Sequence, residues 1–272
     1  MQALNRFLEH SVDKLLDAHA LLLGNARLPI DVREVARASG FLTIEEREMI
    51  PEAVIRPEGT SFTIFLQNNF SGDPGLRLRQ RFSLAHEIAH TFFFELRDGS
   101  MKSRRDAPTG EKLEAACHRG AGLILIPNRF LRDSLRQYRH SISAQDIIQL
   151  SRTFDASLEV VLRRLIQEAV FESSKRAPIL VHRNQNLAGD IEIAAYPTWL
   201  KAVLPTPRRG MDFAVWFRSS GGARDIQQPI VQDSVTLGED GSMARVTALG
   251  VLSACPVNFG RSQRLYELSM EP

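Results

Sequence analysis

The sequence predicts an α+β protein, in which a mainly helical domain with a small sheet precedes a smaller β-rich domain. Before residue 173, apolar residues recur at helical spacing, and one short segment alternates like a strand. The segment 173–178 combines small, basic and proline residues, which is typical of a boundary. Beyond it, short alternating runs are separated by turn residues. We therefore expect a helical segment at 1–25, a main domain at 26–172 and an accessory domain at 176–272.

The composition is ordinary for a globular protein of one large or two smaller domains. The 272 residues are 43% hydrophobic and 24% charged, with a net charge of +2. This near-neutral balance predicts no direct binding to nucleic acid or to a membrane. Cys117 and Cys255 form no disulfide framework, and no apolar run is long enough for a signal peptide or a membrane span. We expect a cytoplasmic protein, and the sequence leaves its oligomeric state open.

The N-terminal elements follow from apolar spacing and capping residues. Residues 1–23 form an amphipathic helix in this interpretation, and residues 31–39 form a short helix that ends at Gly40. The alternation at 62–66 predicts a strand. Asp73-Pro74 then provides an N-cap and a first-turn proline for a longer helix.

That longer helix contains His86-Glu87-Ile88-Ala89-His90, which reads H-E-x-x-H. An offset of four residues places both histidines on one helix face, one turn apart, so both rings can bind one metal ion. Glu87 lies about 100° round the helix from His86, within reach of a water at that ion. Apolar flanks predict a buried helix, where two histidines and a carboxylate are costly unless they bind something. The pattern is typical of zinc peptidases, in which zinc and a glutamate general base activate water.

The third protein ligand is less obvious. Residues 111–126, which precede a proline, predict a second buried helix. Glu111 and Glu114 lie one turn apart near its start; either could reach the metal, and both could simply complement the helix macrodipole. Cys117 and His118 are further candidates, although Cys117 shares a face with Glu114 and fits the core better. The spacing alone leaves this ligand open.

These two helices resemble the ImmA/IrrE metallopeptidases. Residues 79–90, RQRFSLAHEIAH, are similar to the family signature R-x-R-F-[ST]-L-A-H-E-[IL]-[AG]-H. The second helix is similar to the signature E-x-x-[CA]-[ND]-x-[FI]-A-[AG]-x-[LI]-[LI]-x-P, aligned through Glu114, Cys117, Ala121 and Pro127. His118 departs from the family's Asn or Asp, and Gly120 from its bulky apolar residue, which puts the local packing in doubt.

The resemblance implies a zincin-like fold and a function. It makes Glu114 the third zinc ligand beside His86 and His90, with Glu87 as the base. It implies that the substrate is a transcription regulator, often a helix-turn-helix repressor, cut at one site in a stress or mobile-element response. Zinc is the expected cofactor, although Mn²⁺ or Fe²⁺ would accept the same ligands. The strand at 62–66 is where such proteases commonly add the substrate as another strand.

The remaining segments carry weaker signals. Residues 97–110 are charged and loop-like, which suggests a solvated connector more than a lid. Residues 128–172 read as helical, and the pair around 154–157 has a helix-turn-helix spacing, but its sparse basic charge disfavours DNA binding. Tyr138 and His140 are candidates for stabilising a transition state only on their place in the chain.

The C-terminal segment predicts strands but no catalytic site. Its candidate strands are 179–182, 190–195, 213–218, 244–254 and 264–269, with a helix at 197–204. This layout resembles stress-response members of the family, in which a small sensor-like domain follows the protease.

The main alternative is a non-proteolytic regulator whose zinc only holds the fold. The intact Glu87 disfavours it, because a structural site needs no base and usually has four protein ligands. An amidase or small-peptide hydrolase with the same centre also remains open.

Overall fold

The fold comes from a computed structural model, which describes residues 2–24, 27–68, 74–138, 142–171, 176–184, 191–195, 229–237, 242–249 and 261–270. It is mostly helical with small sheets, which confirms the predicted α+β class. The chain divides into two compact units. The first unit is Met1–Gln137 with Ser151–Ser157, and the second is Tyr138–Leu150 with Leu158–Pro272. Each unit is described separately below, and the domain boundaries drawn from the sequence stay predictions.

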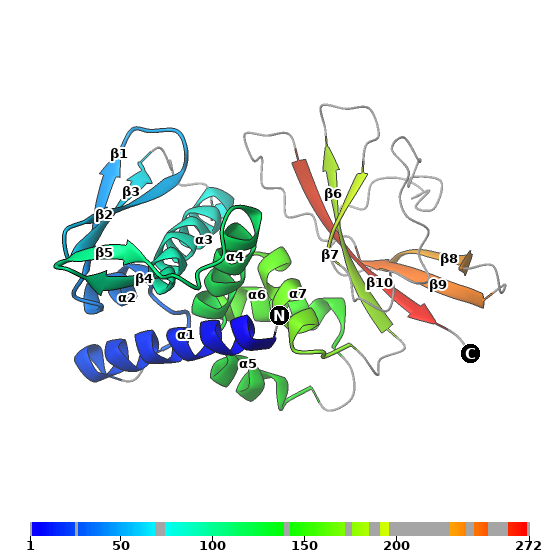
Figure 1. The fold of residues 1–272 in the computed structure, drawn as a ribbon. Helices are drawn as coiled ribbons and strands as arrows, with labels where there is room; N and C mark the ends of the chain where they lie inside the picture. The colour runs from blue at the N-terminus through cyan, green and yellow to red at the C-terminus, as the bar shows by residue number, and fades with distance from the viewer. Residues whose placement is uncertain are drawn as a thin grey trace. The chain divides into compact units, whose positions relative to one another are not determined.

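The first unit begins with two helices that form where the sequence predicts them (Figure 1). Helix α1 (Gln2–Leu23) buries one apolar face, which includes Leu8 and Leu16 at 0% exposure. Helix α2 (Val32–Ala38) is capped by Asp31, whose carboxylate accepts hydrogen bonds from two backbone N–H groups of its first turn. Gly40 follows with φ of +72°, a conformation that favours glycine.

A three-stranded sheet follows α2 in the sequence and precedes the helix with the HExxH motif. Its strands are β1 (Leu42–Arg47), β2 (Ala53–Glu58) and β3 (Ser61–Gln67). The order is β1-β3-β2, with β3 parallel to β1 and antiparallel to β2. Only β3 was predicted from the sequence. It is the central strand, and five of its seven residues are buried.

The helices that carry the HExxH motif and the second signature pack side by side (Figure 1). They are α3 (Pro74–His90) and α4 (Glu111–Leu125), and Pro74 starts α3 as the sequence predicts. A Cβ atom built on Gly120 of α4 would lie 2.7 Å from the Cβ of Ala89 on α3. Any side chain larger than hydrogen at 120 would therefore push the helices apart. This close contact explains why position 120 is glycine, whereas the family signature has a bulky apolar residue there.

The expected loop at 97–110 is partly a β-hairpin. After the short helix η1 (Thr91–Phe93), strands β4 (Phe94–Arg97) and β5 (Ser100–Ser103) pair antiparallel. Asp98 and Gly99 form the connection, both with positive φ. This hairpin could not be predicted from the sequence, because a short, charged and exposed hairpin has little apolar alternation. The first unit also contains α5 (Asn128–Leu135).

The turn with helix-turn-helix spacing is bound to α3. Asp155 adopts φ of +50°, and its carboxylate accepts two hydrogen bonds from Arg77. Arg81 Nε donates to the backbone oxygen of Asp155 at 3.1 Å, and Arg81 Nη2 donates to that of Ile30 at 3.0 Å. The basic residues of α3 thus fix this turn and the start of α2.

The second unit combines two helices and a sheet. Helix α6 (Ala144–Phe154), most of which lies in this unit, starts at a capping box in which Ser143 and Asp146 bond reciprocally. Helix α7 (Leu158–Gln167) follows. The sheet has the antiparallel order β7-β6-β10-β9-β8. Its strands are β6 (Arg176–Asn184), β7 (Ile191–Ala195), β8 (Pro229–Leu237), β9 (Ser242–Leu249) and β10 (Arg261–Met270).

Strands β6, β7, β9 and β10 overlap strands expected from the sequence, whereas β8 was not predicted. The expected strand at 213–218 and helix at 197–204 lie outside the described residues. Within the described part of the chain, no helix is both long and apolar enough to span a membrane.

Candidate metal centre

The two motif histidines lie one turn apart on α3, as their spacing predicts. Their Nε2 atoms are 3.1 Å apart and their rings meet edge to face. His86 is 9% exposed, and His90 is partly buried. Leu84, Ile88 and Ala89 fill the core around them, so the apolar residues of α3 set the direction in which both rings point.

Glu114 brings a carboxylate from α4 to the same point. Its Oε2 lies 3.2 Å from His86 Nε2, and its Oε1 lies 3.7 Å from His90 Nε2. Two ligand atoms held at about 2.0–2.1 Å by one tetrahedral ion lie about 3.3–3.4 Å apart. The separation between the two histidine nitrogens and that between His86 Nε2 and Glu114 Oε2 are close to this value, whereas the longer distance to His90 involves the other oxygen of Glu114. The donor set, two imidazoles and a carboxylate, therefore fits one metal ion such as zinc.

The histidines are neutral in these surroundings. Burial, with smaller effects from His118 and His90, lowers the pKa of His86 to about 4, although Glu114 opposes the shift. Burial likewise lowers the pKa of His90. A neutral imidazole is the form that binds a metal ion, so no proton has to leave before metal binding at neutral pH.

Glu87 lies beside this donor set and is held by the sheet. Its Oε2 accepts a hydrogen bond of 3.0 Å from the backbone N–H of Ile55 on β2. Burial raises the pKa of Glu87 to about 7; the Ile55 N–H opposes this shift, and the charge of Glu114 adds to it. Ile55 could not be predicted from the sequence, because any residue except proline supplies a backbone donor.

Strand β2 is itself fixed to α3 by side chains. Glu52, just before the strand, forms a 2.5 Å ion pair with Arg79, and Ser83 Oγ donates to it at 3.1 Å. Both partners belong to α3, and Arg79 is the first residue of the RQRFSLAHEIAH segment. These contacts fix the position of β2 relative to α3, and therefore the position of the Ile55 N–H relative to Glu87.

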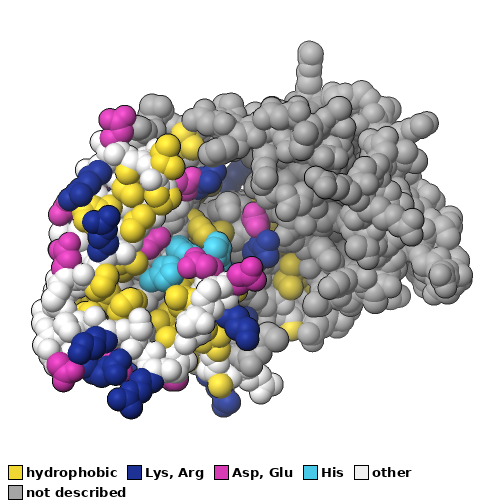
Figure 2. Space-filling model, turned by 45° about the horizontal axis from the view of Figure 1, so that its top comes forward, with side chains coloured by type: hydrophobic (Ala, Val, Ile, Leu, Met, Phe, Trp, Pro, Cys, Tyr) yellow, Lys and Arg dark blue, Asp and Glu magenta, His cyan; other side chains and the backbone are white. Residues whose placement is uncertain are grey.

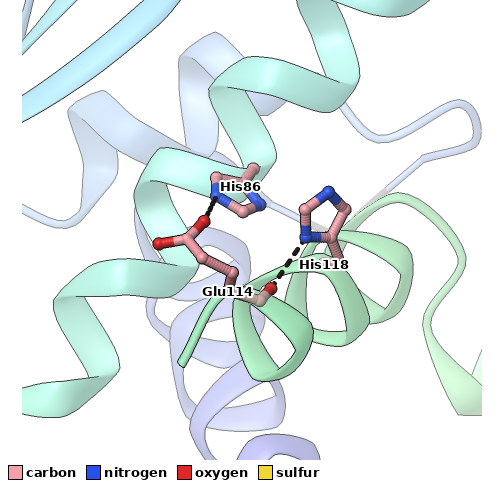
Figure 3. Close-up of side chains that lie close together, drawn as sticks. All are labelled: His86, Glu114 and His118. Atoms are coloured by element: carbon pink, nitrogen blue, oxygen red, sulfur yellow. Dashed lines mark hydrogen bonds and ion pairs between the residues drawn. The ribbon is translucent and has the colours of Figure 1, made fainter. Parts of the chain in front are cut away.

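Of the other ligand candidates, Glu111 and Cys117 lie away from this donor set, whereas His118 adjoins it: the ligand atoms of His86, Glu114 and His118 all lie within 4.8 Å of one another. Glu111 is the exposed first residue of α4. Cys117 is 0% exposed, and burial raises the pKa of its thiol, so it is a core residue. His118 packs its ring against His86, with centroids 4.6 Å apart, and its Nδ1 bonds the backbone oxygen of Glu114 at 2.7 Å (Figure 3).

The centre can be reached from the surface. Glu114 is half-exposed and His118 is exposed. Figure 2 shows the histidines gathered with acidic side chains on one face of the described part of the protein. A site open on one side leaves room for a water and a substrate, which a four-residue structural site does not.

The structure does not place two expected residues at this centre. Tyr138 belongs to the second compact unit, and His140 lies outside the described residues. The strand expected to receive the substrate is β3, but both its edges are already paired, with β1 and β2. That expectation was wrong, because one strand's sequence does not show which neighbours flank it.

Comparisons with known proteins agree with this geometry. Residues 76–166 match the family model for peptidase M78, the IrrE N-terminal-like domain. The matched segment includes His86, Glu87, His90 and Glu114. This match confirms the resemblance inferred from the two signatures and supports a zincin-like metallopeptidase. A comparison with curated proteins found no match.

A solved structure is similar to this chain in fold. It is described as a Mycobacterium tuberculosis transcriptional regulator and aligns with a TM-score of 0.52 at 14% identity. The alignment covers 100% of this chain and 77% of that one. At this identity the likeness concerns the fold alone.

Proposed function

We propose that this protein is a zinc-dependent endopeptidase. The observation that carries the proposal is the convergence of His86, His90 and Glu114 at the spacing of one tetrahedral ion, with Glu87 alongside. His86 Nε2, His90 Nε2 and the Glu114 carboxylate would hold the ion. When bound, zinc supplies a Lewis acid that polarises a peptide carbonyl and acidifies water.

Glu87 is the general base in this proposal. It is largely buried, and the Ile55 N–H holds one of its oxygens, so its carboxylate keeps a fixed position. A carboxylate whose pKa is near neutrality can both accept a proton from water and return it to the leaving amine. A neighbouring cation favours the ionised form that acts as the base.

The outer edge of β2 is the best place for the substrate backbone. Glu52 O accepts from Gln67 N, so even-numbered residues of β2 bond to β3 and odd-numbered ones face outward. Ala53 and Ile55 therefore direct backbone groups away from the sheet, and the N–H of Ile55 is already bound by Glu87. Since α3 packs against this strand, a peptide added here would pass close to Glu87.

We further propose that the substrate is a transcription regulator, often a helix-turn-helix repressor, encoded as a separate protein. Cleavage would occur at one site in a stress or mobile-element response. The resemblance of the two metal helices to ImmA/IrrE metallopeptidases supports this substrate class. The β-rich segment 176–272 would be an accessory, sensor-like domain. The protein would act in the cytoplasm, without binding DNA itself.

The test is co-expression of wild-type protein and Glu87→Gln with each helix-turn-helix regulator encoded nearby, followed by intact-mass measurement of each regulator. Glu87→Gln keeps the size of the side chain and leaves the three ligands in place, so its zinc content should match wild type. We expect one regulator to be cut at a single bond by wild type and to stay whole with Glu87→Gln. Cleavage by both proteins would show that Glu87 is not the base.

The second candidate function is a zinc-stabilised regulator without peptidase activity. It is favoured if zinc-loaded wild type leaves every regulator intact, both in cells and after purification with added zinc. Activity on short peptides in the absence of any regulator would instead indicate a small-peptide hydrolase.

A further inference from the structure

His86 has one ring nitrogen without a partner. Its Nε2 faces Glu114 and His90, whereas its Nδ1 is buried and has no hydrogen bond to any described residue. When Nε2 of a neutral histidine binds a metal, Nδ1 must carry the proton. Metal-binding histidines nearly always donate this N–H to an acceptor, which fixes the ring. His86 therefore needs an acceptor when the centre is loaded.

Three rings pack against His86, and they differ in what they can accept. Phe82 has no lone pair to offer. His90 directs its Nε2 to the same metal position as His86. His118 approaches His86 from a different side than the Glu114 carboxylate does (Figure 3). Among these neighbours, only His118 has a nitrogen that is free to accept.

The contact between His118 and its own helix selects the correct tautomer. The Nδ1 of His118 lies 2.7 Å from the backbone oxygen of Glu114, one turn earlier on α4. A carbonyl oxygen only accepts, so this Nδ1 must donate, and the proton of a neutral His118 is on Nδ1. Its Nε2 then carries a lone pair and no hydrogen.

The distance between the two rings suits a hydrogen bond. Their centroids are 4.6 Å apart with an interplanar angle of 70°. A linear N–H···N bond between two imidazoles holds the centroids roughly 5 Å apart. The exposed His118 ring can adjust toward the buried His86 ring, which the core fixes.

We propose that His118 is the positioning residue of the metal centre: its Nε2 accepts the Nδ1–H of His86, and its Nδ1–H bonds the carbonyl of Glu114. This chain of two hydrogen bonds would join two metal ligands from different helices, His86 on α3 and Glu114 on α4. It rests on the proposed metal centre but not on peptidase activity. It gives the departure at position 118 a function.

The first test needs no variant. Zinc-loaded wild-type protein labelled with ¹⁵N at histidine would be studied by NMR for a scalar coupling across the hydrogen bond between His86 Nδ1 and His118 Nε2. We expect the coupling, together with a slowly exchanging His86 Nδ1–H signal. A loaded centre in which His118 Nε2 is protonated, or bound to zinc itself, would overturn the proposal.

The second test separates accepting from packing. His118→Phe keeps an aromatic ring against Phe82 and His86 but removes both nitrogens, whereas His118→Asn keeps an acceptor but loses the ring. We expect zinc affinity, measured by chelator competition, to fall about 10–100-fold in His118→Phe and clearly less in His118→Asn. His10→Asn, at an exposed position on α1, is the control and should bind like wild type.

The outcomes distinguish this inference from the proposed function. Equal zinc affinity in His118→Phe and wild type would overturn the positioning role even if the protein cleaves its substrate. Cobalt-loaded His118→Phe should keep the wild-type visible spectrum, because a positioning residue is not a ligand; a loss of one ligand would also overturn it. If the coupling and the affinity loss are found but no regulator is cut, only the peptidase proposal fails.

Discussion

The contact between Gly120 and Ala89 makes a quantitative prediction for Gly120→Ala. The added Cβ would lie 2.7 Å from the Cβ of Ala89, and unbonded carbon atoms prefer about 3.5–4.0 Å. Neither atom can rotate away, because each Cβ is fixed to its own helix backbone. The two helices must therefore separate locally by about 1 Å.

Two opposing effects set the size of the change. Overpacking of a core costs about 1–3 kcal/mol, and replacing glycine by alanine inside a helix restores about 1 kcal/mol. We expect a net loss of about 0–2 kcal/mol in the free energy of unfolding. Glu114 is on the same helix, and its distances to His86 and His90 are only 3.2 and 3.7 Å. A shift of about 1 Å exceeds the roughly 0.5 Å tolerance of such a site, so zinc affinity should fall at least about tenfold.

The assay combines urea unfolding of the metal-free protein with chelator competition for zinc. Ala89→Gly in the Gly120→Ala background is the matched control: it removes the facing methyl group, and the helix propensities of the two changes nearly cancel. The double variant should regain both stability and zinc affinity. If Gly120→Ala alone behaves like wild type, or if Ala89→Gly restores nothing, then this contact does not set the spacing of α3 and α4.

Three further predictions concern charge and burial. Asp155→Asn should lower the free energy of unfolding by roughly 1 kcal/mol, because it removes the charge bound by Arg77 and Arg81 while asparagine tolerates the positive φ. These arginines hold the pKa of Asp155 below its ordinary value, so its contribution is present above that value and is lost as the pH falls through the folded-state pKa. Below about pH 4, urea titrations should therefore show wild type and Asp155→Asn converging in stability, and a constant difference would contradict this. In a Cys255→Ser background, mass spectrometry should find Cys117 unalkylated at pH 8 until urea unfolds the protein, whereas labelling of the folded protein would show that its site opens.

The metal helices could be predicted because their signals are local. The spacing of His86 and His90 fixes their common face on any helix, and the apolar flanks predict that the helix is buried. The third ligand was harder to predict. Glu111 and Glu114 both lie near the start of α4, one turn apart, and their spacing does not show which of them faces α3. The resemblance to a family, not the periodicity, favoured Glu114.

What the sequence missed depends on contacts between elements. Strand β2 contains Pro57, which weakens a strand signal but is acceptable at an edge. Strand β1 has the sequence LTIEER, which ends in three charged residues, and only Leu42 at its start is fully buried. The need for glycine at 120 comes from its distance to Ala89, and no pattern within α4 alone contains that distance.

The hydrogen bond from Ile55 to Glu87 makes the register of a sheet part of the chemistry. Successive residues of β2 direct their N–H groups to opposite edges, and Pro57, on the same edge as Ile55, has no N–H. A slip of two residues that brings Pro57 to the place of Ile55 would therefore remove the donor of Glu87 without touching α3 or α4. The length of the loop between β1 and β2 helps to set this register, although none of its residues belongs to the proposed catalytic set.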